Sequence, residues 1–217
     1  MPEKVTIPIS IFDYSSDYVR PVISIWMDRA KLVQNMFDVL AKWDLDVDNV
    51  EPITKGSPSE QGIKIKIPAK RATLFFGPSD CKFSRDAVDW STADETAEIL
   101  RTFLATLMDG TNVQLLNHKT ALIMHLQPTT KKFVDLLKPF LPDGLKGFRT
   151  GEITSGAAVV KWKDGRVTLD GSAIVANAMY LKYEREFDSS VSFETIATEL
   201  RAGEDELFRI LDVEEAV

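Results

Sequence analysis

Two segments of this 217-residue chain have nearly the same sequence. IKIPAKRATL runs from Ile65 to Leu74, and VKWKDGRVTL runs from Val160 to Leu169. In both, apolar and polar residues alternate around a short turn, which is the pattern of two half-buried antiparallel strands. Asp164-Gly165 in the second segment is a strong hairpin signal. This repetition is the strongest constraint on the fold, because repeated segments indicate a repeated structural unit.

The elements expected around these segments also recur in the same order. Each half should contain a strand, a helix, an extended segment, three antiparallel strands and a second helix. We expect an N-terminal strand or extension at 1–19, a first half at 20–111 and a second half at 112–217. Their leading strands are predicted at 20–27 and 120–127. The fold class is therefore α+β, with two tandem copies forming a two-layer, possibly continuous curved sheet backed by helices.

This doubled order resembles the duplicated TATA-binding-protein-like fold, in which two helix-backed antiparallel sheets join into one saddle. The resemblance covers most of the chain and rests on element order, without a signature motif. Members of that family insert pairs of phenylalanines into DNA. Here Phe75 is the one plausible equivalent, and its repeat-mate Asp170 is acidic, so DNA binding of that type is not expected. A competing assignment is a single helix-grip sheet that wraps one long helix.

Strand alternation predicts which side chains lie on the face of the sheet that the helices leave open. If Ile63, Ile65 and Ile67 face the helices, the intervening lysines face outward. The basic residues expected on the open face are Lys64, Lys66, Arg71, Lys82, Lys161, Arg166 and Lys182. Trp26, Phe75 and His125 would add rings to it. Trp162, on the helix side, is expected to be largely buried.

The bulk composition limits the function classes. A net charge of −7 and a pI near 5.0 argue against general binding to nucleic acid or to a membrane surface. A single cysteine, Cys81, allows neither an internal disulfide nor a cysteine-based zinc site. The sequence contains neither a secretory signal nor an apolar run of the roughly 20 residues that a transmembrane helix needs. We therefore expect a cytoplasmic protein without a membrane partner.

Few residues suggest catalysis. His118 and His125 are seven positions apart, which places them on opposite faces of a strand, so no metal site is expected. Cys81 lacks an evident histidine partner. Arg85 and Arg185 should lie on the helix side, where each would snorkel or cap a helix carboxylate and not act in catalysis. No nucleophile, base and oxyanion donor assemble, and no cofactor is expected.

The sequence thus favours a non-catalytic binding protein. Its basic open face, or the seam between the halves, would bind an anionic small molecule or an acidic partner segment. One alternative is a hydrolase-like or transferase-like enzyme in which His125 is the acid–base residue of a site in the seam. Another is a single-stranded nucleic-acid binder. The basic residues could also serve only to keep an exposed sheet soluble. The oligomeric state is left open.

Overall fold

A computed structural model of the chain describes residues 2–23, 28–58, 60–140 and 156–216. These residues form ten strands and four α-helices, which confirms the predicted α+β class. Hydrogen-bonded neighbours along the sheet follow the order β2-β3-β4-β5-β1-β6-β9-β8-β7, and β10 pairs in parallel with β1. The neighbouring pairs β2–β3, β3–β4, β4–β5, β7–β8 and β8–β9 are antiparallel.

The chain divides into two compact units. Unit 1 comprises residues 1–11, 121–185 and 194–217, and unit 2 comprises residues 12–120 and 186–193. Strands β1 (Glu3–Asp17), β6 (Asn117–Pro128) and β9 (Met179–Asp188) contribute residues to both.

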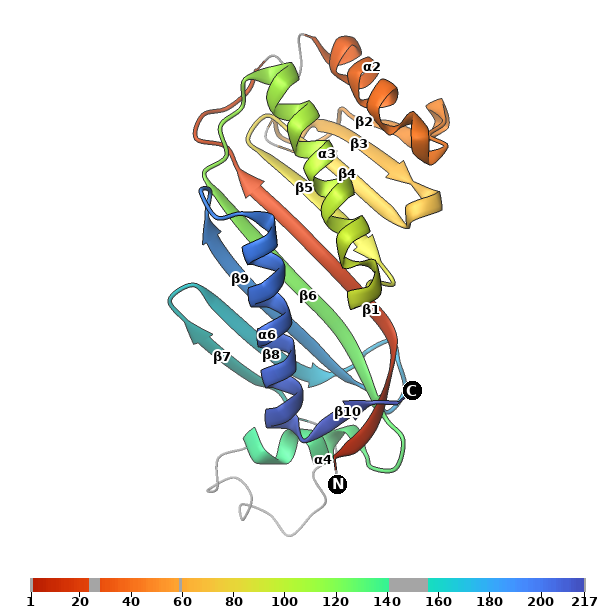
Figure 1. Ribbon diagram of the computed structural model, residues 1–217, viewed down its shortest axis with the longest axis vertical. Coiled ribbons are helices and arrows are strands. Elements are labelled where there is room, and N and C mark those ends of the chain that lie inside the picture. Colours follow the sequence, from red (N-terminus) through yellow and green to blue (C-terminus); the bar gives the residue numbers. More distant parts are fainter. Residues whose placement is uncertain (1, 24–27, 59, 141–155, 217) are drawn as a thin grey trace. The chain divides into compact units, whose positions relative to one another are not determined.

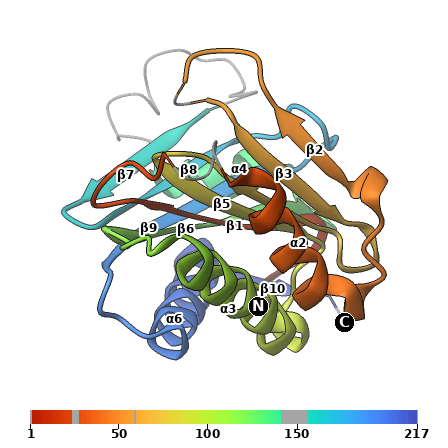
Figure 2. The ribbon, with the colours of Figure 1, turned by 90° about the horizontal axis from the view of Figure 1, so that it is seen from above.

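Unit 2 is built mainly from four further strands and two helices (Figure 1). The strands are β2 (Val50–Ile53), β3 (Gly62–Ile67), β4 (Ala72–Phe76) and β5 (Asp80–Asp86), and the helices are α2 (Arg29–Leu40) and α3 (Ala93–Thr111). Both helices lie on one side of these strands (Figure 2). Phe76 of β4 meets Phe103 of α3, with 6.3 Å between ring centroids. This contact identifies the helix-covered face of β4.

The core of unit 2 follows the predicted alternation. Ile63, Ile65 and Ile67 are fully buried. Leu74 pairs with Ile65 on one side and with Phe83 on the other, so apolar side chains continue across β3, β4 and β5 on the helix side. Burial of such side chains contributes roughly 1.5–3 kcal/mol each. The lysines between them are consequently directed to the open face.

Unit 1 has the same kind of layering. It contains α4 (Phe133–Leu137), β7 (Ala158–Trp162), β8 (Gly165–Gly171), α6 (Phe193–Leu211) and β10 (Val213–Glu215), with parts of β1, β6 and β9. Tyr183 of β9 packs against the backbone of α6 at Gly203. Leu169 and Leu181 are paired in register and buried, next to the buried pair Val167 and Tyr183. These residues mark the helix-covered face of β8 and β9.

Several sequence-predicted boundaries differ from the structure. Residues 20–23 are not in a strand, and residues 24–27 lie outside the described residues. The apolar spacing at 128–141 predicts a helix capped by Thr129 or Thr130. Among the described residues this helix is confined to α4 and a short 3-10 turn at 138–140, because Thr130 instead donates to the Glu3 carboxylate. Helix α6 continues through Gly203 without a break. No helix in the described part of the chain is both long and apolar enough to cross a membrane.

Candidate binding face

The open face of unit 2 carries two rows of aligned side chains. In the first row, Lys64 pairs with Phe75, and Phe75 pairs with Lys82. In the second, Lys66 pairs with Thr73, which pairs with Ser84. Directly opposite residues in an antiparallel sheet have Cβ atoms about 4.5–5.5 Å apart, so each row forms a contiguous strip. The sequence prediction that Lys64, Lys66 and Lys82 share this face is confirmed in register.

The ring of Phe75 lies over two glycines in this strip. A Cβ atom built on Gly62 would be 2.7 Å from Phe75 Cε2, and one built on Gly77 would be 3.1 Å from Cε1. The aromatic ring thus occupies the space that two side chains would otherwise fill. Lys82 Nζ is 5.4 Å from the ring centroid, within cation–π range. Phe75 remains partly exposed and forms an aromatic platform beside a cation. We call Lys64, Phe75 and Lys82 the Phe75 strip.

Carboxylates on the same face neutralise much of its positive charge. Lys66 pairs with Glu51 at 3.8 Å, and Lys82 pairs with Asp80 at 2.9 Å. Lys119 forms an ion pair with Asp17. The open face is therefore of mixed charge. Lys64 makes no ion pair or side-chain hydrogen bond with the described residues, although Glu51 stands opposite it in register.

Sequence reasoning missed these carboxylates. For Asp80 a signal was present, because Asp80 and Lys82 stand two residues apart on β5 and strand parity places both on the open face. Asp17 comes from β1, which the sequence prediction treated as an extension outside the repeat. Asp13, which accepts a hydrogen bond from Ser84 at 2.6 Å, belongs to the same missed strand.

The predicted basic residues of unit 1 are also largely paired. Arg166 and Lys182 both contact the carboxylate of Glu184. Although burial acts in the opposite direction, hydrogen bonds from these two cations hold the Glu184 pKa below its ordinary value. Lys161 is exposed and has no ion-pair partner within the described residues. The open face of unit 1 therefore also lacks a block of free positive charge.

Two predicted site residues lie elsewhere. Arg71 follows the turn between β3 and β4 in the left-handed region, with φ 49°, and is exposed. It is at the end of the strands and not within the two rows. Trp26 lies outside the described residues. Trp162 is half-buried, contrary to the expectation, because it ends β7, the last strand in the sheet order, where it packs against Tyr183 and over Gly165.

His125 is buried in unit 1, where it supports a loop. Its Nδ1 atom is 2.8 Å from Ser172 Oγ, and only 5% of the residue is exposed. Ser172 Oγ accepts the backbone N–H groups of Ile174 and Val175, so its own proton is directed to the imidazole. Burial lowers the His125 pKa. The imidazole therefore anchors the loop between β8 and β9. The sequence predicts a strand over 173–186, but β9 begins only at Met179, so residues 173–178 belong to this loop.

His118 has an equally structural environment in unit 2. Nε2 is 3.2 Å from the carbonyl oxygen of Ser189, which can only accept, so Nε2 carries the proton. Nδ1 consequently accepts from the hydroxyl of Tyr14 at 2.8 Å. The ring of Phe193 packs against both. Burial lowers the His118 pKa. Both nitrogens are engaged, which leaves no free position for a metal or a proton-transfer partner.

Cys81 has the chemistry of a core residue. It is fully buried in unit 2. Burial raises the pKa of its thiol to about 12, so the thiolate is scarce at neutral pH. In the described part of the chain, no group of three or more histidine, cysteine, aspartate or glutamate side chains could hold a metal ion.

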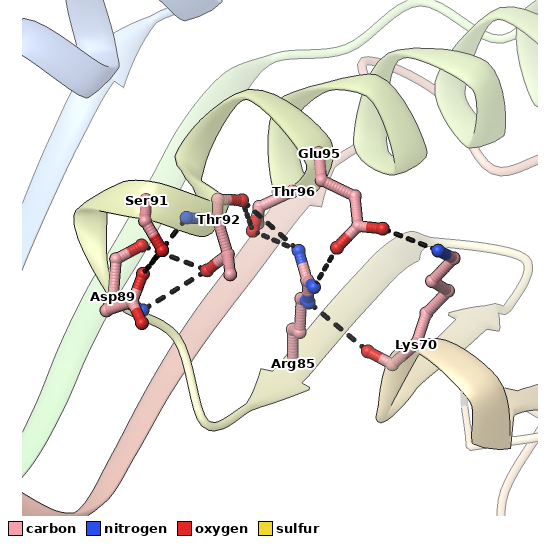
Figure 3. A network of polar contacts seen from close by, with 7 residues as sticks. All are labelled: Lys70, Arg85, Asp89, Ser91, Thr92, Glu95 and Thr96. Atoms are coloured by element: carbon pink, nitrogen blue, oxygen red, sulfur yellow. Dashed lines mark hydrogen bonds and ion pairs between the residues drawn. The ribbon is translucent and has the colours of Figure 1, made fainter.

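The two helix-side arginines pair with helix carboxylates, as predicted. Arg85 donates to Glu95 and Thr96 of α3 and to the backbone oxygens of Lys70 and Thr92 (Figure 3). Arg185 pairs with Glu199 of α6 at 3.5 Å and with Asp164 at 3.2 Å.

The Arg85 network also fixes the start of α3. Asp89 accepts from the backbone N–H of Thr92 and from Ser91 Oγ, and so caps the turn that leads into the helix. Lys70 adds a second cation to the Glu95 carboxylate (Figure 3). With Arg85 almost fully buried and every contact internal, the network acts as a structural tie between β5 and α3.

These observations define a partly exposed aromatic-cationic strip on unit 2 and buried, structurally engaged histidines in both units. No protein-family model matches the chain, and a search of curated proteins gave no match.

Proposed function

We propose that this chain is a non-catalytic binding protein whose open sheet face binds an anionic ligand or an acidic partner segment. The observation that carries the proposal is the Phe75 strip. Its platform is preformed, because the ring rests on Gly62 and Gly77. Lys64 is available for an anion, while Lys82 lies within cation–π distance of the ring. A ligand with a flat or apolar part next to a negative group fits this arrangement.

The mixed charge of the surrounding face supports selectivity rather than general attraction. Glu51 and Asp80 would repel an anion that extends beyond the strip. A long polyphosphate backbone would meet these carboxylates, whereas a short anionic group would not. We therefore rank the acidic segment or small anion above single-stranded nucleic acid.

We further propose that the fold is an internal duplication related to the TATA-binding-protein-like class. The support is the element order, which reads β1-α2-β2-β3-β4-β5-α3 and then β6-α4-β7-β8-β9-α6. The matched segments at 65–74 and 160–169 lie on hairpins in both cases. A cytoplasmic location is part of the same proposal and draws on the single, buried Cys81.

The enzymatic alternative around His125 has less support. Its Nδ1 is committed to Ser172, whose oxygen already accepts two backbone N–H groups. A general base needs a reachable substrate proton, and this ring is almost fully buried.

The proposal is tested by titrating a short labelled peptide of sequence EFE, which carries one ring and two carboxylates, into the protein at low salt. Binding is measured by fluorescence anisotropy. We expect K64E/K82E to weaken binding at least about tenfold, because two favourable charges become repulsive. The matched control is K31E/K42E, the same charge change on exposed lysines of the helix side, which should bind within about twofold of wild type. Phe75→Ala should weaken binding without changing its salt dependence.

Three outcomes would contradict the proposal. One is the absence of binding to wild type at low salt. Another is an equal loss in both charge variants, which would indicate a general charge effect. A third is tighter, Phe75-dependent binding of an oligothymidine, which would favour the single-stranded nucleic-acid alternative.

A further inference from the structure

Strand β7 ends the order of hydrogen-bonded strands in the sheet. It pairs with β8 from Ala158 to Trp162, and β8 is its only neighbour among the described residues. Figure 1 shows it at the margin of unit 1. Val159 and Val160, at the centre of this strand, are 63% and 54% exposed. Because successive side chains point to opposite faces, the strand is exposed on both faces, and no described strand covers its outer edge.

Proteins usually protect such an edge. Proline, short length, charged side chains and bulges all discourage the addition of another strand. The other terminal strand, β2, has four residues and includes Glu51 and Pro52. Strand β7 is nearly as short, with five residues, and carries Lys161, but it has no proline and presents two adjacent exposed valines. The N–H and C=O groups along its outer edge pair with no described strand, so they can accept a further one.

The charges around β7 identify the kind of strand that fits. Lys161 and Lys163 are exposed, and neither makes an ion pair or side-chain hydrogen bond with the described part of the chain. The nearby carboxylates are already engaged, since Glu184 binds Arg166 and Asp164 binds Arg185. The edge is therefore locally positive in a protein whose net charge is −7.

We infer that β7 binds an extended acidic segment of a partner protein as an added strand. Backbone hydrogen bonds would supply the pairing, Val159 and Val160 would contact apolar side chains, and the two lysines would select acidic ones. A second copy of this chain fits less well, because a β7–β7 pair would place lysines of both copies along one ladder. This inference concerns unit 1 and does not depend on the function proposed for unit 2.

The test uses a labelled peptide of sequence EVETEVE with the full chain at low salt, again by anisotropy. A peptide of sequence KVKTKVK is the charge control. A third peptide keeps the acidic sequence but is N-methylated at the central threonine and at the glutamate that follows it. Neighbouring residues direct their N–H groups to opposite edges, so this change removes a donor from each edge without altering charge.

We expect wild type to bind EVETEVE, to bind the methylated peptide at least about tenfold more weakly, and not to bind KVKTKVK. The variant K161E/K163E should reverse the charge preference, while K131E/K132E, on exposed lysines of the same unit, should not. Equal binding of the methylated peptide would reduce the interaction to charge alone and overturn the inference. The absence of any peptide binding would also overturn the inference. The same holds for a concentration-dependent dimer in sedimentation that the peptide dissociates, because the edge would then bind a second copy of this chain.

Discussion

Replacement of Gly203 by alanine should destabilise the protein, although it lies inside a helix. Gly203 is an internal residue of α6, which is continuous from Phe193 to Leu211. In an exposed helix interior, glycine to alanine stabilises by about 1 kcal/mol, since alanine loses less conformational entropy. Propensity alone therefore predicts a more stable variant.

The packing of Tyr183 reverses this expectation. A Cβ atom at position 203 would lie 2.5 Å from both Cε1 and Cζ of Tyr183 and would also overlap its hydroxyl, whereas ordinary contacts are 3.4–4 Å. Tyr183 is only 4% exposed and its ring packs next to Trp162, so it cannot swing into solvent. Overpacking of this kind costs about 1–3 kcal/mol. After subtracting the helix gain, we expect G203A to lower the free energy of unfolding by about 1 kcal/mol.

Urea unfolding followed by circular dichroism measures this change. In a Tyr183→Leu background the overlapping atoms are absent, so G203A should then stabilise by up to about 1 kcal/mol. The sign should therefore reverse between the two backgrounds, a coupling of about 2 kcal/mol. Thr198→Ala, on an exposed position of the same helix, is the control and should change stability by less than about 0.5 kcal/mol. Stabilisation by G203A in the wild-type background would refute the reasoning.

Three further predictions concern two buried polar side chains of unit 2, His118 and Arg85, and the β7–β8 hairpin of unit 1. Burial holds the His118 pKa below its ordinary value of about 6.5, so the unfolded chain takes up the proton first as the pH falls. The free energy of unfolding should therefore be at its full value above pH 6.5 and decrease as the pH falls through that value. In His118→Asn the urea midpoint should change less between about pH 7.5 and 5.5 than in wild type. Glu95→Gln leaves the buried Arg85 with neutral acceptors only, so it should lower the free energy of unfolding in urea by about 1–3 kcal/mol. The control Glu98→Gln, on the exposed side of α3, should lower it by less than about 0.5 kcal/mol. Equal losses would contradict a structural role for the Arg85 network. Gly165→Ala should lower the thermal midpoint, since its Cβ would lie 2.5 Å from the backbone oxygen of Glu184 and 2.7 Å from the Trp162 ring. An unchanged midpoint would contradict this close packing.

The predictable part of this protein was the part with a local repeat. Period-2 alternation at 63–67 placed three isoleucines in the core and the two lysines between them on the open face, because strand geometry alone sends successive side chains to opposite sides. The apolar spacing from Ala93 to Met108 likewise predicts the helix that the structure shows as α3, because this spacing and the capping residues beside it are local signals. The helix-side position of Arg85 followed from the same parity.

The candidate site depended on contacts between distant residues. Whether a lysine on the open face is available or neutralised depends on which carboxylate the neighbouring strand brings opposite it, and sequence spacing does not specify that register. Asp17 neutralises Lys119 across 102 positions, and Glu3 draws the Thr130 turn away from a longer helix across 127. The same holds for glycines: Gly62 supports the Phe75 ring and Gly203 admits Tyr183, roles that appear only when the layers pack. Alternation determined which face each side chain occupies, and tertiary pairing decided what it meets there.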